Sequence, residues 1–444
     1  MRRALQISMV VTVCLVLAFS TVSLAASKTL TMYHAFTSNT LEALKNLIAD
    51  FEQENPGIKV KPQYVGDALM QKLQAAVAAG DPPDLAWTHG GEYGEFAKAG
   101  AIYKMEDFIR RPDGLSNEEL DDFFPVMKTY CEYNYDDQWW VLPVNATTIT
   151  FVYNADMFAA AGMDPDNPGI ETWEDFAIAA GKLSDPQKGI WGFHIPVFSG
   201  GMAGYFDWIF RPFIWAAGGT YISDDLQSVA FDSPEAKEAV KFFYDLMHEY
   251  KGGTITPADQ AFAMGKVAIT LDGPWSIPQF EKLRFPWRTM LYPVGPSGKR
   301  YHPSAGEPVT IFKDAKYPEE AWLFVKFWMR TDNMAKWAIT SGYLPTRRSV
   351  LEDPIYAAHV EKTPGLEYFV KGLDYGTVSE YVPSWNKVID TYAAAVELIM
   401  NNKVTLDKGI DDAAAKANEA IKRYWEDYPE EYEQVMSRLE ARQE

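Results

Sequence analysis

Apolar and polar residues alternate with two different periods along the first part of the chain. The period of two over 28–34 and 58–65 is typical of half-buried strands, whereas Leu41, Leu44 and Phe51 recur on one face of a helix. The predicted elements are a strand at 28–34, a helix from a cap at Ser38-Asn39 to the Asn55-Pro56-Gly57 stop, a strand at 58–65, a helix at 67–79 and a strand at 84–87. This order predicts right-handed crossovers and an open, mostly parallel α/β sheet.

Ligands of such sheets bind beyond the carboxyl ends of the strands. The residues at those ends are therefore candidate ligand-binding residues. They are His34, Phe36, Thr37, Asp67 and His89.

The pattern continues as a second α/β section. A β-rich stretch at 138–153 is crossed by Pro143, and a turn-rich passage at 292–303 precedes another strand near Glu307. Further helices are predicted at 172–182, 233–250, 259–264 and 319–329, with long helices from Trp385 to Glu440. The chain contains no internal repeat, and its length favours two domains.

The first 26 residues have the pattern of a secretory signal peptide. A charged MRR start precedes the apolar stretch Ile7–Phe19, and small residues end at Ala25-Ala26. Cys14 lies inside the apolar stretch rather than at the cleavage point, so we expect no lipid anchor. Removal of this segment leaves Cys131 as the one cysteine, which excludes an internal disulfide. We expect a soluble protein exported to the periplasm or cell exterior.

The net charge and the aromatic content of the chain limit the classes of molecule that it is expected to bind. A net charge of −20 argues against nucleic acid and anionic membranes, and it disfavours a highly anionic ligand. Aromatic residues make up 14% of the chain, and 14 of them are tryptophans, more than packing usually demands. Aromatic side chains outside a core are typical of recognition surfaces for flat-faced ligands.

No motif for metal, cofactor or covalent chemistry stands out. The six histidines lack metal-binding spacing, and the sequence has no nucleophile elbow, phosphate-binding loop or dinucleotide fingerprint. The stretch from Asp164 to Asp175 resembles a calcium loop, but Pro168 stands where a ligand oxygen is needed. We predict a plain loop there and no cofactor. A carboxylate pair for glycoside hydrolysis stays open on residue counts alone.

Four tryptophans lie beside turns or hydrogen-bonding residues: Trp87, Trp208, Trp275 and Trp385. Trp322 and Trp328 lie in an apolar helix and are predicted to be core. Any one of the four could equally be core, but together they indicate a site. A sugar ring presents a CH-rich face to an aromatic ring and hydroxyls to polar side chains, which fits this combination.

Several segments together resemble the family 1 extracellular solute-binding proteins of ABC importers, the group that includes the maltose-binding proteins. The matching segments are FEQENPGIKV (51–60), VAAGDPPDLAWTH (77–89), Phe96–Gly100, QWWVLPVNATTITFVYN (138–154), TWEDF (172–176), AFAMGKVAITLDGPW (261–275), PEEAWLFVKFW (318–328) and GYLPTRR (342–348). Their order and spacing make the resemblance specific over nearly all of the chain after residue 26.

The resemblance implies two α/β lobes that close on a ligand held in the cleft between them. The first lobe would be 27–143 plus 304–349 and the second 147–302 plus 352–444, with crossings near 143–147, 302–306 and 349–352. Trp87, Trp275, Trp385 and Tyr205 match aromatic ligand contacts of the family. From strand ends, crossings and neighbouring segments we add the candidates Trp208, Asp207, Asp272, Asn145, Gly306, Glu307, Tyr343 and Arg347.

Two positions depart from the maltose-binding relatives. Thr147 replaces an acidic residue at the first crossing, and Gly90-Gly91 replaces a charged pair. We therefore predict a monomeric carbohydrate-binding protein that delivers its ligand to the permease of an ABC importer, without assigning maltodextrin. One alternative is a binder of a glycerol phosphate or other polyol, for which Arg211 and Arg347 offer a cationic clamp. Arg211 could equally form a surface ion pair, and Arg347-Arg348 could contact the permease. A second alternative is a secreted glycoside hydrolase.

Overall fold

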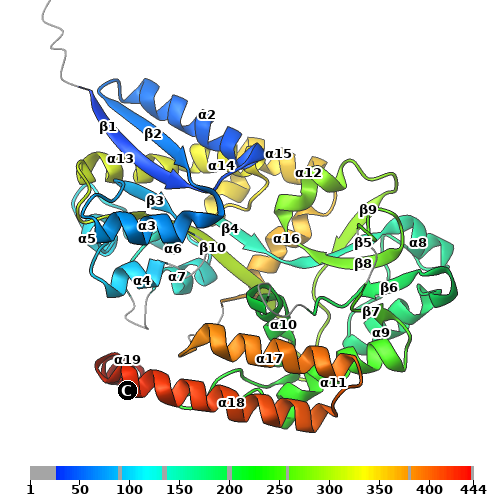
Figure 1. Ribbon diagram of the computed structural model, residues 1–444. Coiled ribbons are helices and arrows are strands. Elements are labelled where there is room, and N and C mark those ends of the chain that lie inside the picture. Colours follow the sequence, from blue (N-terminus) through cyan, green and yellow to red (C-terminus); the bar gives the residue numbers. More distant parts are fainter. Residues whose placement is uncertain are drawn as a thin grey trace, which may run out of the picture.

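Two β-sheets flanked by helices lie side by side in the protein (Figure 1). The structure, a computed structural model, describes residues 27–88, 93–132, 138–197, 203–256, 260–378 and 382–441, without the Asp67 side chain. The signal peptide predicted at 1–26 and the candidate His89 lie outside the described residues. The sheets form the two lobes of an α/β fold, as the resemblance implies.

The first sheet has the strand order β11-β10-β3-β1-β2, and β4 pairs with β10. Its strands are β1 (Lys28–His34), β2 (Ile58–Tyr64), β3 (Leu85–Trp87), β4 (Leu142–Thr148), β10 (His302–Ile311) and β11 (Gly376–Thr377). The parallel pairing predicted for β1, β2 and β3 is confirmed. β10 runs antiparallel to both β3 and β4.

The second sheet has the order β7-β6-β8-β5-β9. Its strands are β5 (Thr150–Asn154), β6 (Trp191–His194), β7 (Gly253–Thr254), β8 (Val267–Asp272) and β9 (Trp287–Met290). β6 is parallel to β7 and β8, whereas β5 is antiparallel to β8 and β9. Both sheets are therefore mixed, because the strands that cross between the lobes enter each sheet against the direction of their neighbours.

Helices cover both sheets. Around the first sheet lie α2 (Ser38–Glu54), α3 (Leu69–Ala78), α4 (Tyr93–Lys98), α5 (Glu106–Ile109), α6 (Asn117–Asp121), α7 (Pro125–Cys131), α13 (Pro318–Trp328) and α14 (Thr331–Ser341). Around the second lie α8 (Ala155–Ala160), α9 (Trp173–Lys182), α10 (Ala203–Ala217), α11 (Pro234–His248), α17 (Trp385–Met400) and α18 (Leu406–Asp427). The remaining helices are α12 (Ile277–Phe280), α15 (Pro354–Lys362), α16 (Leu366–Gly372) and α19 (Pro429–Ala441). The short 3-10 turns are η1 (Gly66–Ala68), η3 (Pro186–Lys188), η5 (Pro274–Ser276), η6 (Arg348–Glu352) and η7 (Leu373–Tyr375).

Two local predictions need correction, and one helix is absent from the predicted elements. The N-cap of α2 is Thr37, not Ser38-Asn39, and its side chain makes no capping hydrogen bond. The helix predicted at 259–264 is wrong for its described part, because positive φ angles at Gln260 and Gly265 turn the chain before β8. α10 was not predicted, since it is buried on nearly every face and contains Pro212, which leaves no amphipathic stripe.

The stretch that resembles a calcium loop ends in a helix cap. Thr172 caps α9, and Asp175 Oδ2 accepts hydrogen bonds from the Thr172 N–H (2.9 Å) and hydroxyl (2.8 Å). The cap lowers the pKa of the Asp175 carboxyl, chiefly through the hydroxyl bond. This carboxylate therefore has a role in helix capping.

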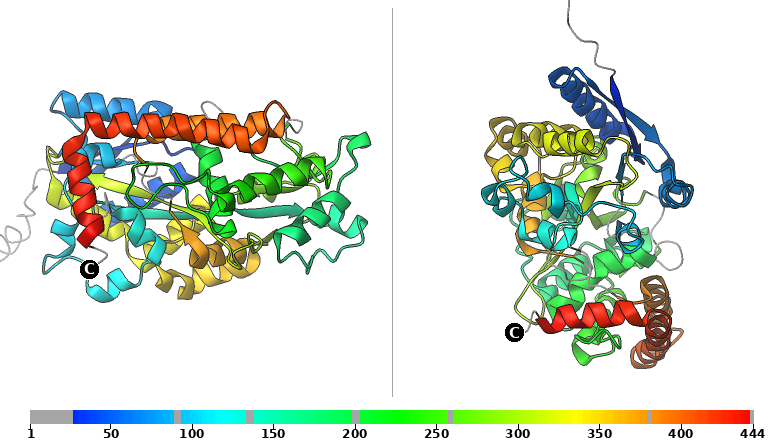
Figure 2. Two further views of the ribbon diagram at one scale, coloured as in Figure 1. Left: turned by 90° about the horizontal axis from the view of Figure 1, so that it is seen from below. Right: turned by 90° about the vertical axis from the view of Figure 1, so that its left-hand side faces the viewer.

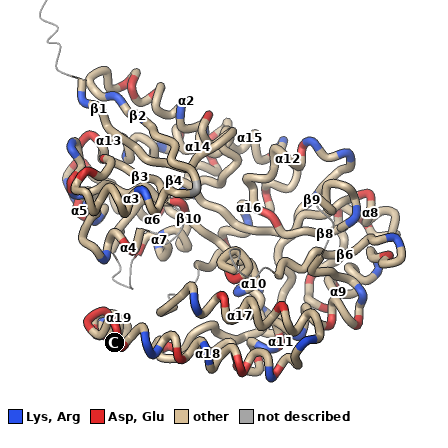
Figure 3. The backbone as a smooth tube through the Cα atoms, viewed as in Figure 1, with Lys and Arg blue, Asp and Glu red and all other residues tan. Residues whose placement is uncertain are grey.

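The hydrophobic core forms two clusters, each built mainly on one sheet, and the first cluster also includes Val152 of β5 and Trp287 of β9. Trp322 and Trp328 are 2% and 0% exposed, which confirms them as core. The cluster of the first sheet also takes in Leu366 and Phe369 of α16, so the lobe boundaries stay a prediction. Charged residues of both signs are spread over the outer helices (Figure 3). Within the described residues, no helix combines the length and the apolar character needed to cross a membrane.

Candidate functional site

The crossing strand β10 places a carboxylate between the lobes. Glu307 is 9% exposed and pairs with Asn145 of β4 in the strand ladder. Its Oε2 accepts a hydrogen bond from Asn145 Nδ2 (2.6 Å), and its Oε1 accepts one from the Tyr343 hydroxyl (3.1 Å). Burial raises the pKa of Glu307 to about 7, against the opposing effect of hydrogen bonds from Asn145, Tyr343 and Trp87.

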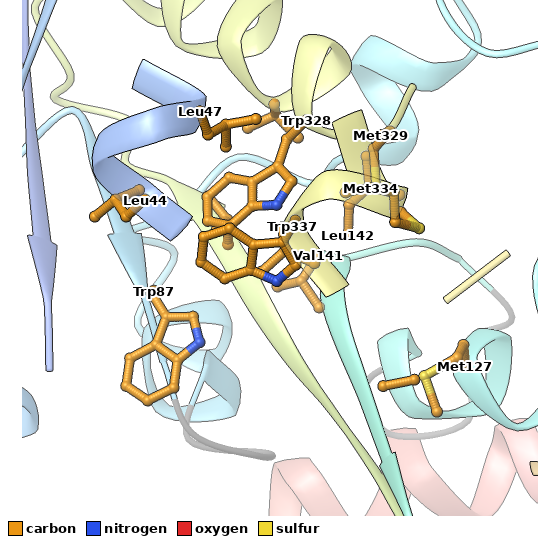
Figure 4. Close-up of a cluster of buried hydrophobic side chains, with 14 of the residues drawn as sticks. Leu44, Leu47, Trp87, Met127, Val141, Leu142, Trp328, Met329, Met334 and Trp337 are labelled. Atoms are coloured by element: carbon orange, nitrogen blue, oxygen red, sulfur yellow. The ribbon is translucent and has the colours of Figure 1, made fainter. Parts of the chain in front are cut away.

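Aromatic rings of the first lobe hold the Asn145 amide that donates a hydrogen bond to this carboxylate. The Trp337 indole N–H donates to Asn145 Oδ1, so the amide group is held from both ends. Trp337 packs edge-on against Trp328 with 4.5 Å between ring centroids, as Figure 4 shows. Phe36 lies between Trp337 (5.4 Å) and Trp87 (4.7 Å). Trp337 was not a candidate, because its helical neighbours carry no signal for a partner in β4.

The second lobe contributes the turn after β8. Asp272 Oδ1 accepts hydrogen bonds from the Gly273 N–H (2.7 Å) and the Ser276 hydroxyl (2.8 Å). The Trp275 ring lies against Gly273, where a Cβ atom would come within 2.2 Å of the ring. The backbone of η5 thereby directs the indole back over the turn, and no larger residue fits at position 273.

Trp275 joins an aromatic group from both lobes. Its ring stacks on Trp208 of α10 (6.4 Å between centroids, 25° between planes) and lies 6.2 Å from Tyr343. Trp208 in turn packs edge-on against Tyr205 (6.0 Å). Tyr343 connects this group to Glu307, so side chains of the two lobes form one continuous cluster at the crossing.

Several polar atoms of this region have no protein partner. The buried Trp208 Nε1 and Thr147 Oγ1 make no hydrogen bond within the described residues. Asp272 Oδ2 accepts none either, while burial raises the pKa of this carboxyl to about 6. Because unpaired buried polar groups are costly, Trp208 Nε1 and Thr147 Oγ1 are suited to a ligand with polar groups, and Asp272 Oδ2 can accept a further hydrogen bond from that ligand.

The remaining aromatic and strand-end candidates differ in burial. His34 is buried at the end of β1, where its Nδ1 accepts the Phe36 N–H (3.1 Å) and burial lowers its pKa to about 4. Thr37 is exposed. Trp385 is 40% exposed at the start of α17 and packs beside Gly204 of α10. Gly306 faces Tyr130 and Pro143, which fill the space beside it.

Asp207, Arg211 and Arg347 pair with other protein groups outside the cluster, and the carboxylate of a fourth charged candidate, Asp67, lies outside the described atoms. Asp207 and Arg211 form a buried ion pair (2.5 Å) inside the second lobe, so Arg211 is neither a surface residue nor a ligand clamp. Arg347 is 7% exposed and is held by Asp122 (2.8 Å) and the Met329 carbonyl (2.9 Å). The backbone of Asp67 lies in η1, and nothing described locates its carboxylate.

Comparisons with known proteins identify the family and the fold of the chain. The model of the bacterial extracellular solute-binding protein family matches residues 37–335. The chain is 24% identical over 379 residues to a maltotriose-binding protein of Pyrococcus abyssi, covering 84% of this chain and 77% of the relative. It is 23% identical over 431 residues to the sn-glycerol-3-phosphate-binding periplasmic protein of Escherichia coli K12, covering 90% and 94%.

A solved structure shows the same fold. An ABC transporter solute-binding protein of Thermotoga lettingae, bound with α-D-tagatose, is 27% identical with a TM-score of 0.72. The similarity covers 89% of this chain and 100% of that structure. Since the family match also spans more than half of the sequence, the chain belongs to the bacterial extracellular solute-binding proteins.

Proposed function

We propose that this protein captures a mono- or oligosaccharide between its two lobes and delivers it to an ABC importer. The observation that carries the proposal is the aromatic cluster of Trp275, Trp208, Tyr205 and Tyr343, joined to polar atoms that lack protein partners. Aromatic faces suit the CH face of a sugar ring. Hydroxyl groups both donate and accept, and so complement Trp208 Nε1 and Asp272 Oδ2 together.

Electrostatics favours a sugar over a glycerol phosphate. Two carboxylates with raised pKa values, Asp272 and Glu307, belong to the site. Arg211 and Arg347, the cations proposed for a phosphate clamp, are buried in ion pairs elsewhere. A phosphate dianion near Asp272 would meet a like charge without a described cation to balance it, which disfavours binding.

The proposal includes the export route and the partner. A signal peptide at 1–26 would be removed to give a periplasmic or extracellular protein without a lipid anchor. The monomeric protein would then meet the permease subunits of the importer with its ligand enclosed. Family membership and the resemblance to ABC-importer binding proteins support this part of the proposal.

A thermal-shift screen tests the ligand class. We expect at least one mono- or oligosaccharide to raise the melting temperature, because a ligand that binds only the native state stabilises it by mass action. sn-Glycerol 3-phosphate should leave it unchanged. Mass spectrometry of the recovered sugar should find it intact, whereas cleavage products would support a hydrolase. Stabilisation by the phosphate and by no sugar would overturn the proposal.

A further inference from the structure

The C-terminal helices of the second lobe reach the first lobe at a point distant from the crossing strands. α18 runs along one side of the molecule, and α19 turns below the first lobe (Figure 2). Figure 1 shows the end of this helix pair near α4, well away from β4 and β10. The contact joins residues 333 positions apart in the sequence.

Four side chains make this contact. The Lys98 ammonium of α4 forms an ion pair with Glu431 of α19 and lies 4.0 Å from the centre of the Tyr428 ring. It is also 5.7 Å from the ring centre of Tyr424. The Tyr424 hydroxyl donates to both Glu431 oxygens (3.1 Å each), which orients the carboxylate toward α4.

The contact is well suited to be broken and remade. Lys98 stays 37% exposed and Glu431 10% exposed, so the charges keep some contact with water in the observed position. α19 has Val435 as its one buried residue, and its Tyr432 and Leu439 pack against the core only partly buried. A helix with so little buried surface can adjust its position. Because the contact lies far from the crossing strands, a small rotation of the lobes separates Lys98 from Glu431 by a large displacement.

We propose that Lys98, Tyr424, Tyr428 and Glu431 form a lobe latch that holds the two lobes together and slows ligand release. These residues are positioning residues, since none of them belongs to the candidate site. The effect on ligand release rests on the proposed function. The effect on lobe separation does not.

Lobe separation is measured by single-molecule energy transfer without ligand. Dyes are attached to cysteines introduced at exposed Gln53 of α2 and Lys416 of α18, because the native Cys131 is buried. We expect Lys98→Met to shift the distances to longer values and Lys98→Glu to shift them further by repulsion from Glu431. The charge-swapped Lys98→Glu/Glu431→Lys variant should restore the wild-type distribution and show that the fold is intact.

The matched control is Lys28→Met. Lys28 pairs with Glu320 and lies 5.9 Å from the Tyr317 ring centre, the same chemistry within the first lobe alone. Its loss should leave the distances unchanged. Unchanged distances in both Lys98 variants would overturn the latch.

Ligand release is the second readout. With a sugar identified by the thermal-shift screen, Lys98→Met should raise the dissociation rate roughly two- to fivefold, the scale of one exposed cation–π contact and ion pair. The difference from wild type should shrink as salt is raised, since screening weakens the wild-type pair. If no sugar binds, the proposed function fails while the ligand-free distances still decide the latch. A shift in distances with an unchanged dissociation rate would remove the link to ligand release.

Discussion

At the scale of single residues, Trp275 is the side chain on which the sugar proposal depends most directly. It is half-buried between Trp208 and Tyr343, at the meeting point of the lobes. We expect Trp275→Ala to weaken sugar binding by about 1–3 kcal/mol through loss of a stacked aromatic contact. Isothermal titration calorimetry on the folded variant measures this effect.

Trp322 provides the comparison. It is buried in the first-lobe core and stacked on Phe108 (5.4 Å), away from the candidate site. Trp322→Phe should therefore lower the melting temperature without a specific effect on affinity. Equal affinities of wild type and Trp275→Ala would mean that Trp275 only fills space between the lobes.

Glu307 gives a pH dependence with a definite sign. Its pKa is about 7 in the folded protein against a model value of 4.5, so the folded state keeps a proton that the unfolded state releases. This group therefore contributes stability at low pH that is lost as pH rises from 4.5 to 7, up to about 3 kcal/mol.

The variant Glu307→Gln removes this titration. The melting temperature of wild type relative to the variant should fall between pH 4.5 and 7. His34, whose pKa is lowered to about 4, contributes in the opposite direction but to the same extent in both proteins. Glu118→Gln, at an exposed position of α6, should keep the wild-type slope. Parallel pH profiles for wild type and Glu307→Gln would contradict the burial effect.

The sequence indicates some site residues better than others. Trp87 and Trp275 are candidates because they lie beside turns and match aromatic contacts of the resembled family, whereas Glu307 is a candidate because it lies at a predicted crossing. The prediction of Asp207 as a ligand contact overlooks its spacing of four from Arg211, which is a signal for an ion pair within a helix. Arg347 pairs with Asp122, which is 225 positions away in the sequence. The residues next to Arg347 give no indication of this partner.

At the scale of elements, the turn from β8 into η5 controls the direction of Trp275. A Cβ at position 273 would overlap the indole, so Gly273→Ala must displace the ring or the turn. We expect it to lower sugar affinity about as much as Trp275→Ala. Gly57→Ala, at a turn with nothing within 4 Å of the added carbon, is the matched control and should bind as wild type does. Normal affinity of Gly273→Ala would show that the turn does not orient the ring.

Elements with a clear period of apolar residues are predicted well, whereas elements without such a period are not. α11 is predicted by the Ser233 cap and by the apolar residues that recur on one face of the helix. α10 is apolar on nearly all faces because α11, α17 and β10 all pack on it, and no single face stands out. Its position depends on tertiary contacts that a local pattern does not contain.

At the scale of the whole molecule, the order of strands and helices predicts α/β sections and the family resemblance implies two lobes, but neither gives the contacts between the lobes. The direction of β10 and β4 depends on how the chain returns between the sheets. The lobe latch depends on the contact of α19 with α4, which the sequence pattern of neither helix predicts. Alternation and spacing describe each lobe separately, whereas side chains far apart in the sequence join them.

The crossing strands also limit how the lobes move. β4 and β10 pair from Ser304–Thr148 to Val309–Leu142, with one irregularity after Glu307. Sliding one strand along the other would break this whole ladder, whereas rotation at its ends breaks little of it. The strand pair therefore resists sliding but permits twisting. We expect the lobes to rotate about the paired strands, so that residues far from these strands move further than residues close to them.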